Sequence, residues 1–225
     1  MTKKGTTKDG RTEPETAPAA DIRDVILEKA LPHVAFDGWT VTALAAGARD
    51  AGLDAARAQL AFPGGEVEAI RHFSDWLDGR MLDALAKREL KAMKIRERIA
   101  TAVMARLDLA LPHREAVRRS LAVLALPHNT PVALGLLYRT VDQIWHAAGD
   151  TSTDFNFYTK RGLLAGVLSA TTLYWLNDAS EDQQDTRRFL DRRIEDVMRV
   201  PQTFGRLRKF VESLPTPFNA FRRPS

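Results

Sequence analysis

The chain has 225 residues, of which 44% are hydrophobic and 28% charged, which is ordinary for a globular protein that can bury a full-sized core. It contains no cysteine, which excludes disulfides, thiolate metal sites and cysteine nucleophiles. The formal charge is +4, but residues 199–225 alone carry six basic residues and one acidic residue, so the rest is nearly neutral. This distribution argues against a broad nucleic-acid surface and for a local anionic partner, such as a membrane face.

Residues 1–20 are polar, rich in Thr and Pro, and without apolar periodicity, which predicts a disordered leader. They contain no apolar central stretch, as a signal peptide has, and three acidic residues argue against an organelle transit peptide. The uncharged run 162–177 is 16 residues, shorter than the roughly 20 needed to cross a bilayer. It is better interpreted as a buried helix.

Apolar residues recur at helical spacing along almost every other segment, and no stretch alternates as a strand does. Asp21 is an acceptable N-cap for a first helix. A second helix spans about 40–50 and ends at Gly52, since glycine can take the left-handed conformation there. Asp54 can cap a third helix that reaches about residue 62.

Further helices are expected at 67–85, 92–110, 113–125, 131–147, 154–177 and 182–199. Helices joined by short connections predict an all-α bundle. We therefore expect a leader at 1–20, a helical domain at 21–198 and a separate tail at 199–225.

The three short helices within 21–62 have the proportions of a DNA-binding helix-turn-helix, with the turn at 51–54. The candidate recognition helix, however, offers only Arg57 and Gln59 for contacts with DNA. Asp54 cancels its single charge, and phosphate contacts usually dominate affinity for duplex DNA. A structural role is favoured, and no nucleic-acid partner is expected.

Catalytic motifs are not found in the sequence. The five histidines show no H-x-x-x-H or H-E-x-x-H spacing, and there is no G-x-S-x-G or phosphate-cradling glycine loop. We predict no catalytic residues, no cofactor and no metal site.

The helix at 154–177 carries two notable patterns. Thr153 is a plausible N-cap, Asp154 suits the first turn, and Phe155 and Phe157 lie about 200° apart around the axis, so both cannot face one core. Small residues form a stripe that permits close helix packing, the favoured reading, or leaves room for a ligand: Gly162, Gly166, Ser169 and Ala170. A set of apolar residues can line a cavity or pack in the core: Leu163, Leu164, Val167, Leu168, Leu173 and Trp175.

The tail contains an amphipathic basic helix between Pro201 and Pro215. Its apolar residues at helical spacing are Phe204, Leu207, Phe210, Val211 and Leu214, flanked by Arg206, Arg208 and Lys209. Burial of such side chains in the interface, together with about 1 kcal/mol per basic residue near an anionic leaflet, favours reversible docking to a membrane surface. Packing on the bundle or on a partner subunit is an equal alternative.

Five segments resemble, in the same order, the family of lipid-binding accessory proteins of ubiquinone (coenzyme Q) biosynthesis. They are PHVAFDGW (32–39), AFPGGEVEAIRHFSDW (61–76), IRERI (95–99), AAGDTSTDFNFYTKR (147–161) and LNDASEDQQDTRRFLDRRIEDVM (176–198). The pattern GD-x-STDFN is specific to that family, and the resemblance covers roughly residues 21–198.

The resemblance implies a TetR-like all-α fold, with an N-terminal three-helix unit that no longer serves transcription, and a homodimer. It also implies a non-catalytic protein whose apolar pocket binds an isoprenoid quinone intermediate or a phospholipid. A C-terminal amphipathic helix places it on the inner face of the cytoplasmic membrane in a bacterium, or on the matrix side of the mitochondrial inner membrane in a eukaryote. A TetR-type regulator that binds DNA through residues 40–62 is the alternative.

In that family, the segment that matches 147–161 lies on the surface that docks the di-iron demethoxyubiquinone hydroxylase. Carried over, the resemblance places Asp154, Tyr158 and Arg161 on this docking surface. Phe157 stands where the family commonly has Trp, and Ile144 where relatives can carry Met; both are assigned to the same surface. Thr153 and Asp154 begin the helix, with Phe155 turned inward.

Overall fold

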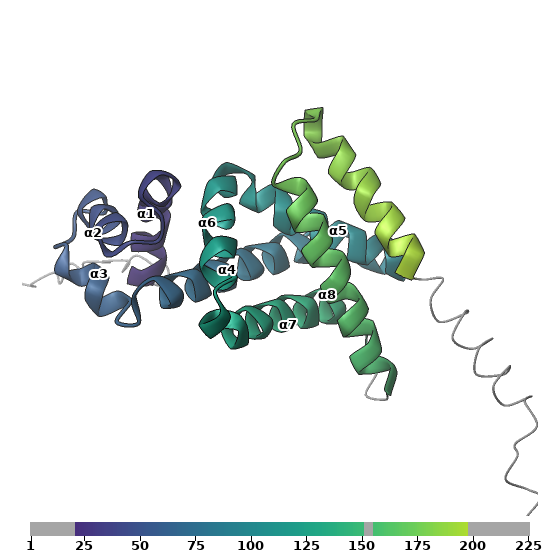
Figure 1. The fold of residues 1–225 in the computed structure, drawn as a ribbon. Helices are drawn as coiled ribbons and strands as arrows, with labels where there is room; N and C mark the ends of the chain where they lie inside the picture. Colours follow the sequence, from purple (N-terminus) through teal and green to yellow (C-terminus); the bar gives the residue numbers. More distant parts are fainter. Residues whose placement is uncertain (1–20, 151–154, 198–225) are drawn as a thin grey trace, which may run out of the picture.

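The computed structural model describes residues 21–150 and 155–197, with side chains from Tyr158 onward in the second range, and all of its regular elements there are helical (Figure 1). The α-helices are α1 (Ile22–Asp37), α2 (Val41–Asp50), α3 (Ala56–Ala61), α4 (Gly65–Ala86), α5 (Ile95–Ala110), α6 (Arg114–Leu124), α7 (Thr130–Ala147), α8 (Phe155–Trp175) and a last helix at 184–197. The predicted all-α bundle is confirmed for the described residues.

Helices α1 to α3 form a unit at one end of the molecule, α8 and the last helix lie at the other end, and α7 runs from below α6 toward α8 (Figure 1). The carboxylate of Asp21 accepts a hydrogen bond of 3.0 Å from a main-chain N–H of the first turn of α1, as predicted. Helices α1 and α2 approach closely at Gly47, where an added Cβ would lie 2.6 Å from Ala30. Only glycine allows this contact.

The turn between α2 and α3 forms as the sequence indicates. Gly52 takes a φ of +74°, and the N–H of Leu53 donates to the carbonyl of Ala48 at 2.9 Å, the hydrogen bond of a glycine C-cap. The Asp54 carboxylate accepts from the N–H of Ala56 at 2.8 Å. Both predictions are confirmed, although α3 has only six residues.

The helix predicted at 92–110 begins three residues later than expected. Residues Leu90–Ala92 form a 3₁₀ turn, and α5 starts at Ile95. The Glu97 carboxylate accepts a hydrogen bond of 3.0 Å from the N–H of Lys94 and so satisfies a donor that precedes the helix. Side-chain capping, rather than helix propensity, sets this boundary.

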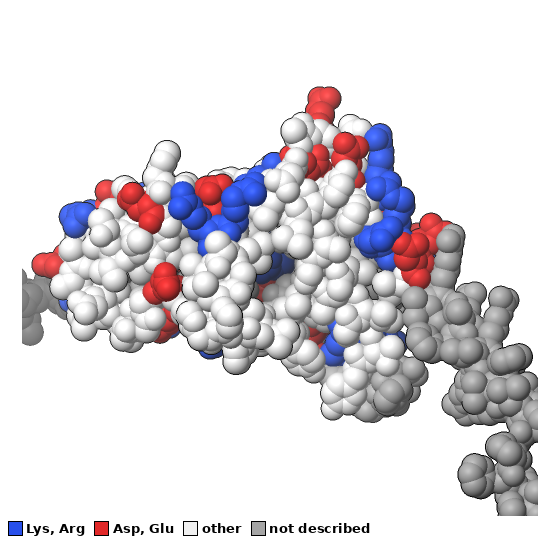
Figure 2. All heavy atoms as spheres, in the orientation of Figure 1, with Lys and Arg blue, Asp and Glu red and all other residues white. Residues whose placement is uncertain are grey.

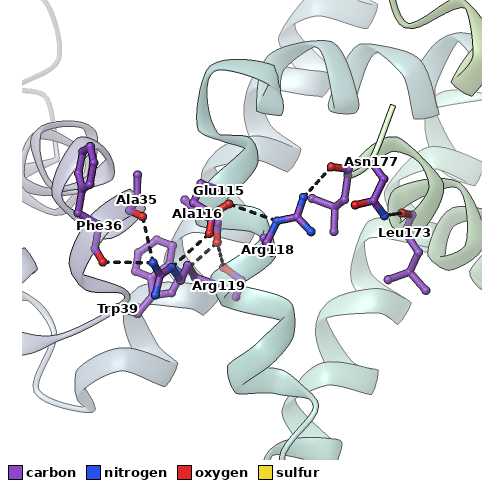
Figure 3. Close-up of polar contacts among 11 residues, drawn as sticks. Ala35, Phe36, Trp39, Glu115, Ala116, Arg118, Arg119, Leu173 and Asn177 are labelled. Atoms are coloured by element: carbon purple, nitrogen blue, oxygen red, sulfur yellow. Dashed lines mark hydrogen bonds and ion pairs between the residues drawn. The ribbon is translucent and has the colours of Figure 1, made fainter. Parts of the chain in front are cut away.

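Helix α6 joins the two ends of the molecule through arginines on its opposite sides (Figure 3). Arg119 donates to the carbonyl oxygens of Ala35 at 3.2 Å and Phe36 at 3.1 Å, at the end of α1. Arg118 donates to the carbonyl of Leu176, just beyond α8, at 2.7 Å. These carbonyls lie near helix C-termini, where the helix dipole favours a cation.

A buried tryptophan continues the core from the three-helix unit into the rest of the bundle. The indole N–H of Trp39 donates to the carbonyl of Ala116 on α6 at 3.2 Å, and its ring lies 5.3 Å from that of Phe73 on α4. Both rings are buried. The unit is therefore packed firmly onto α4 and α6.

Asp178 organises the connection from α8 to the last helix. Its carboxylate accepts hydrogen bonds from the main-chain N–H and the hydroxyl of both Ser180 and Thr186, at 2.5 to 2.9 Å. Burial favours the neutral acid, but these four bonds outweigh burial and hold the pKa of Asp178 well below its usual range.

Within the described part of the chain, no single helix is long and apolar enough to cross a bilayer. One pair of helical segments, Ile95–Leu124 and Pro127–Ala147, meets that test only when joined across a bend of 98°.

Candidate functional site

A cavity of about 410 Å³ lies between α4, α5, α6, α7 and α8. Most of its wall is apolar, which suits a hydrophobic ligand. The lining residues are Ile70, Phe73, Ser74 and Leu77 on α4; Arg106 on α5; Val117, Ser120, Leu121 and Leu124 on α6, then Ala125; Ala133, Leu134, Leu136, Leu137 and Thr140 on α7; and Leu168, Ser169, Thr172 and Leu173 on α8.

The mouth of the cavity carries two exposed leucines. Leu134 on α7 is 61% exposed and Leu173 on α8 is 58% exposed. By contrast, Ile70 and Leu77 on α4 are buried in the wall. The surface is hollowed between α6, α7 and α8, with charged side chains visible at the bottom behind an uncharged rim (Figure 2). An apolar chain can enter here without crossing a charged barrier.

The floor holds a buried ion pair. Asp78 is 1% exposed, and its Oδ1 lies 2.6 Å from Nε of Arg106, while its Oδ2 accepts from the Thr140 hydroxyl at 2.7 Å. Nη2 of Arg106 donates to the Ser74 hydroxyl oxygen at 3.2 Å. Since a buried charge must be paired or hydrogen-bonded, this network satisfies Asp78 and aims Arg106.

This arrangement combines an apolar wall with a few polar groups at its inner end. Such a cavity can hold an apolar molecule and fix the orientation of a polar end. In residues 21–150 and 155–197, no group of three or more His, Asp or Glu side chains is placed to hold a metal ion.

The junction of α7 and α8 contains the AAGDTSTDFNFYTKR segment, away from the residues of both helices that line the cavity. Gly149 takes a φ of +87° and closes α7, with its N–H donating to the carbonyl of His146 at 2.9 Å. Next to it, the Asp150 carboxylate lies 2.9 Å from Nζ of Lys160 and 3.6 Å from Nη1 of Arg161. Charged residues from the two ends of this segment therefore pair with each other and connect α7 to α8.

Comparison with known proteins identifies the chain. The COQ9 family model matches residues 130–201, which include α7, α8 and the connection after α8. The ubiquinone biosynthesis protein COQ9, mitochondrial, of Rattus norvegicus is 37% identical over 93% of this chain and 69% of its own length. The Homo sapiens protein of the same name is 36% identical over 93% of this chain and 68% of its own length.

The chain belongs to the COQ9 family. These relatives are named as ubiquinone biosynthesis proteins, which supports a role for the chain in that pathway. By name they are also mitochondrial. A crystal structure of a TetR transcriptional regulator from Nitrosomonas europaea superposes with a TM-score of 0.65 at 23% identity, over 79% of this chain and 98% of that one. At that identity the likeness shows the fold alone.

The lipid-binding residues predicted for this COQ9 family member are only partly brought together. Leu168 lines the cavity, as does Leu173. Leu163, Leu164, Val167 and Trp175 are not in its wall; Trp175 instead is buried, with its indole N–H donating to Gln183 at 2.5 Å. One helix turns only a narrow face toward any one cavity, so the lipid-binding role of these four residues stays a prediction.

The predicted docking residues differ in their exposure to solvent. Tyr158 is 70% exposed. Ile144 is fully buried, and Arg161 is 6% exposed, so neither side chain lies open on the surface. Asp154 and the side chain of Phe157 fall outside the described residues, as do the predicted N-cap Thr153 and the side chain of Phe155.

The structure describes the predicted small-residue stripe but not the predicted membrane-binding residues. The membrane-binding residues Phe204, Leu207, Arg208, Lys209, Phe210, Val211 and Leu214 all lie outside the described residues. In the small-residue stripe, an added Cβ at Gly162 or Gly166 would meet nothing within 4 Å, so neither glycine serves close packing against another described helix.

The polar floor was missed from the sequence, although one signal was present. Ser74 and Asp78 lie four residues apart on the face of α4 that also carries Leu77 and Met81. A serine and an aspartate on an apolar helical stripe indicate a buried polar network. Its partner Arg106 lies 28 residues from Asp78, and no spacing rule connects them.

Proposed function

We propose that this chain is a non-catalytic lipid-binding protein of ubiquinone biosynthesis, which takes polyprenylated quinone intermediates from a membrane and passes them to a demethoxyubiquinone hydroxylase. The observation that carries the proposal is the apolar cavity of about 410 Å³ with its polar floor and exposed mouth. Removing an isoprenoid chain from water favours its binding by about 25 cal/mol per Å² of apolar surface. A phospholipid is the alternative occupant of the same cavity.

Extraction of the purified chain, followed by mass spectrometry of the lipids, tests this proposal. The variant Leu173→Arg places a charge at the mouth and should lower the amount of bound lipid. Leu60→Arg is a matched control, since Leu60 is also exposed, at 73%, but lies on α3 away from the cavity. Isoprenoid or acyl lipid that is missing from the wild type, or equal in both variants, would contradict the proposal.

We propose Tyr158 as the centre of the hydroxylase-docking surface, since it is the described residue of the predicted set that is exposed. Tyr158→Ala should weaken complex formation with the hydroxylase at unchanged melting temperature, because an exposed ring contributes little to folding and much to an interface. Tyr138→Ala is the control, as Tyr138 is also an exposed tyrosine, at 47%, on α7. Equal binding by both variants would count against this surface.

Membrane attachment through residues 199–225 rests on the amphipathic pattern of their sequence. Deleting residues 200–225 should reduce sedimentation of the chain with anionic phospholipid vesicles. Neutral vesicles serve as the control, because the expected attraction is partly electrostatic and depends on anionic lipid. Vesicle binding that is unchanged by the deletion would argue for a tail that packs on protein.

We also propose that the chain forms a homodimer, as the family resemblance implies. Gly162 and Gly166 are exposed on α8 and leave room for a second helix to approach. Light scattering of Gly166→Leu should report a lower mass than the wild type. An unchanged mass would show that the dimer contact does not lie at Gly166.

DNA binding through residues 40–62 is the alternative function. The exposed residues of α3 are Ala56, Arg57, Gln59 and Leu60, a near-neutral and partly apolar set. Specific, salt-sensitive binding of a duplex by the chain would support a regulator, because phosphate contacts make such binding fall steeply with salt.

A further inference from the structure

We propose that the Arg106–Ser74 end of the cavity binds a neutral, hydrogen-bond-accepting head group, such as a quinone or phenol ring, and that the apolar tail of the ligand leaves through the mouth. The inference rests on the proposed function and specifies the orientation and chemical class of the ligand. The inference is based on a polar floor beneath an apolar wall, where only some of the Arg106 N–H donors have a hydrogen-bond acceptor.

Some hydrogen-bond donors of the floor have no acceptor among the described residues. Arg106 lines the cavity, and its Nε and Nη2 donate to Asp78 and Ser74. Its third nitrogen, Nη1, makes no hydrogen bond with any residue that the structure describes. The Ser74 hydroxyl oxygen accepts from Arg106, which leaves its own proton to donate. Hydrocarbon against these donors would leave them unsatisfied, so the polar end of the ligand belongs here.

The charge of the floor selects the kind of head group. The positive charge of Arg106 is already balanced by Asp78, whose carboxylate has 1% exposure. A phosphate would therefore bring an unbalanced negative charge next to a buried carboxylate, at a large desolvation cost. A carbonyl, phenol or methoxy oxygen accepts a hydrogen bond from Arg106 without adding charge. The site thus favours a quinone ring over a lipid phosphate.

The size of the cavity sets the path of the tail. A volume of about 410 Å³ is at the lower end of the range for drug-sized ligands, so a long polyprenyl chain cannot fit inside together with its ring. The tail passes Leu134 and Leu173 at the mouth. The ring is then covered by the protein, and a hydroxylase can reach it only after it leaves the cavity. The chain extracts the ring from the membrane surface while the tail stays in an apolar phase.

Binding of three C15 isoprenoid probes to the full chain tests the inference: a farnesyl benzoquinone, a farnesyl phosphate and the parent hydrocarbon. The wild type should bind the quinone more tightly than the other two. Arg106→Lys keeps a charge beside Asp78 but loses Nη1 and Nη2, and it should weaken quinone binding by about ten-fold, the value of one good hydrogen bond. Hydrocarbon affinity should not change. Arg139→Lys is the control, because Arg139 pairs with Asp75 outside the cavity wall.

Other binding results would overturn either the inference or the proposed function. A quinone-to-hydrocarbon ratio that is the same in the wild type and Arg106→Lys would overturn the inference and leave the proposed function standing. So would tighter binding of the phosphate than of the quinone. A wild type that binds none of the probes would overturn the proposed function itself. If Arg106→Lys fails to fold, Ser74→Ala decides, since it leaves the ion pair intact and should lower the same ratio.

Discussion

The guanidinium of Arg161 on α8 lies 2.6 Å from the carboxylate of Asp142 on α7. Its other side faces Asp150, which also pairs with Lys160. Arg161 is 6% exposed, so it lies inside the joint between the two helices. A residue expected on the docking surface therefore holds the helix that presents Tyr158.

The first prediction concerns the stability of this joint. Arg161→Ala should lower the free energy of unfolding by about 2–3 kcal/mol, less than a fully buried pair because Asp142 is half-exposed. Urea unfolding measures the change. Arg188→Ala is the control, since the exposed pair of Arg188 with Asp185 should contribute under about 1 kcal/mol. Equal losses in the two variants would show that Arg161 is not a core residue of the joint.

The second prediction concerns the contact between α1 and α2. Gly47→Ala places a Cβ 2.6 Å from Ala30 and should destabilise the chain by about 1–3 kcal/mol through overpacking. Gly79→Ala is the matched control in α4, where nothing lies within 4 Å of the new Cβ, and it should stabilise by about 0.5–1 kcal/mol. The two melting temperatures should move in opposite directions. A Gly47→Ala variant as stable as the wild type would refute the close packing.

Much of the fold could be predicted because helical periodicity and capping are local. Asp21, Gly52 and Asp54 act at their predicted helix ends, where a side chain or a left-handed residue satisfies nearby main-chain groups. The start of α5 could not be placed, because Glu97 and the 3₁₀ turn before Ile95 compete with helix propensity. Local rules predict where a helix exists better than where it begins.

The site could be predicted only in part, because it is built by five helices. Periodicity gives the face that Leu168 shares on α8, but not which helices pack against it. Leu164 and Val167 are buried, as apolar residues on a helix usually are, yet they do not line the cavity. The pair of Asp78 and Arg106 forms only when α4 and α5 pack together. Periodicity does not show which helices pack together, and so it does not show which side chains pair between them.

The third prediction concerns the cap at Asp178. Asp178→Asn keeps the shape of the side chain but cannot accept all four hydrogen bonds from Ser180 and Thr186, and it should cost about 1–3 kcal/mol at neutral pH. The folded pKa of Asp178 lies below the unfolded value of 3.8, so its stabilisation is present above that pH and is lost as the pH falls. The difference between wild type and variant should therefore shrink in acid. Asp185→Asn, at an exposed site, is the control.

The last prediction concerns His113, whose ring packs edge-on against Phe73 and Trp76 at 6.4 and 5.8 Å. Burial and the nearby charge of Arg80 lower its pKa from 6.5, and Glu28 opposes them only in part. The unfolded chain thus binds this proton more tightly than the folded chain. The contribution of His113 to stability is complete above pH 6.5 and is lost as the pH falls toward the folded pKa.

Urea unfolding about one pH unit above and below 6.5 measures this effect. His113→Gln removes the titrating group, so its free energy of unfolding should change less between the two pH values than that of the wild type. His128→Gln is the control, since His128 is exposed and lies in the turn before α7. Equal pH dependence in the wild type and His113→Gln would mean that the ring beside Phe73 takes up its proton as easily in the folded chain as in the unfolded one. That result would contradict the lowered pKa that partial burial and the charge of Arg80 give His113 in the folded chain.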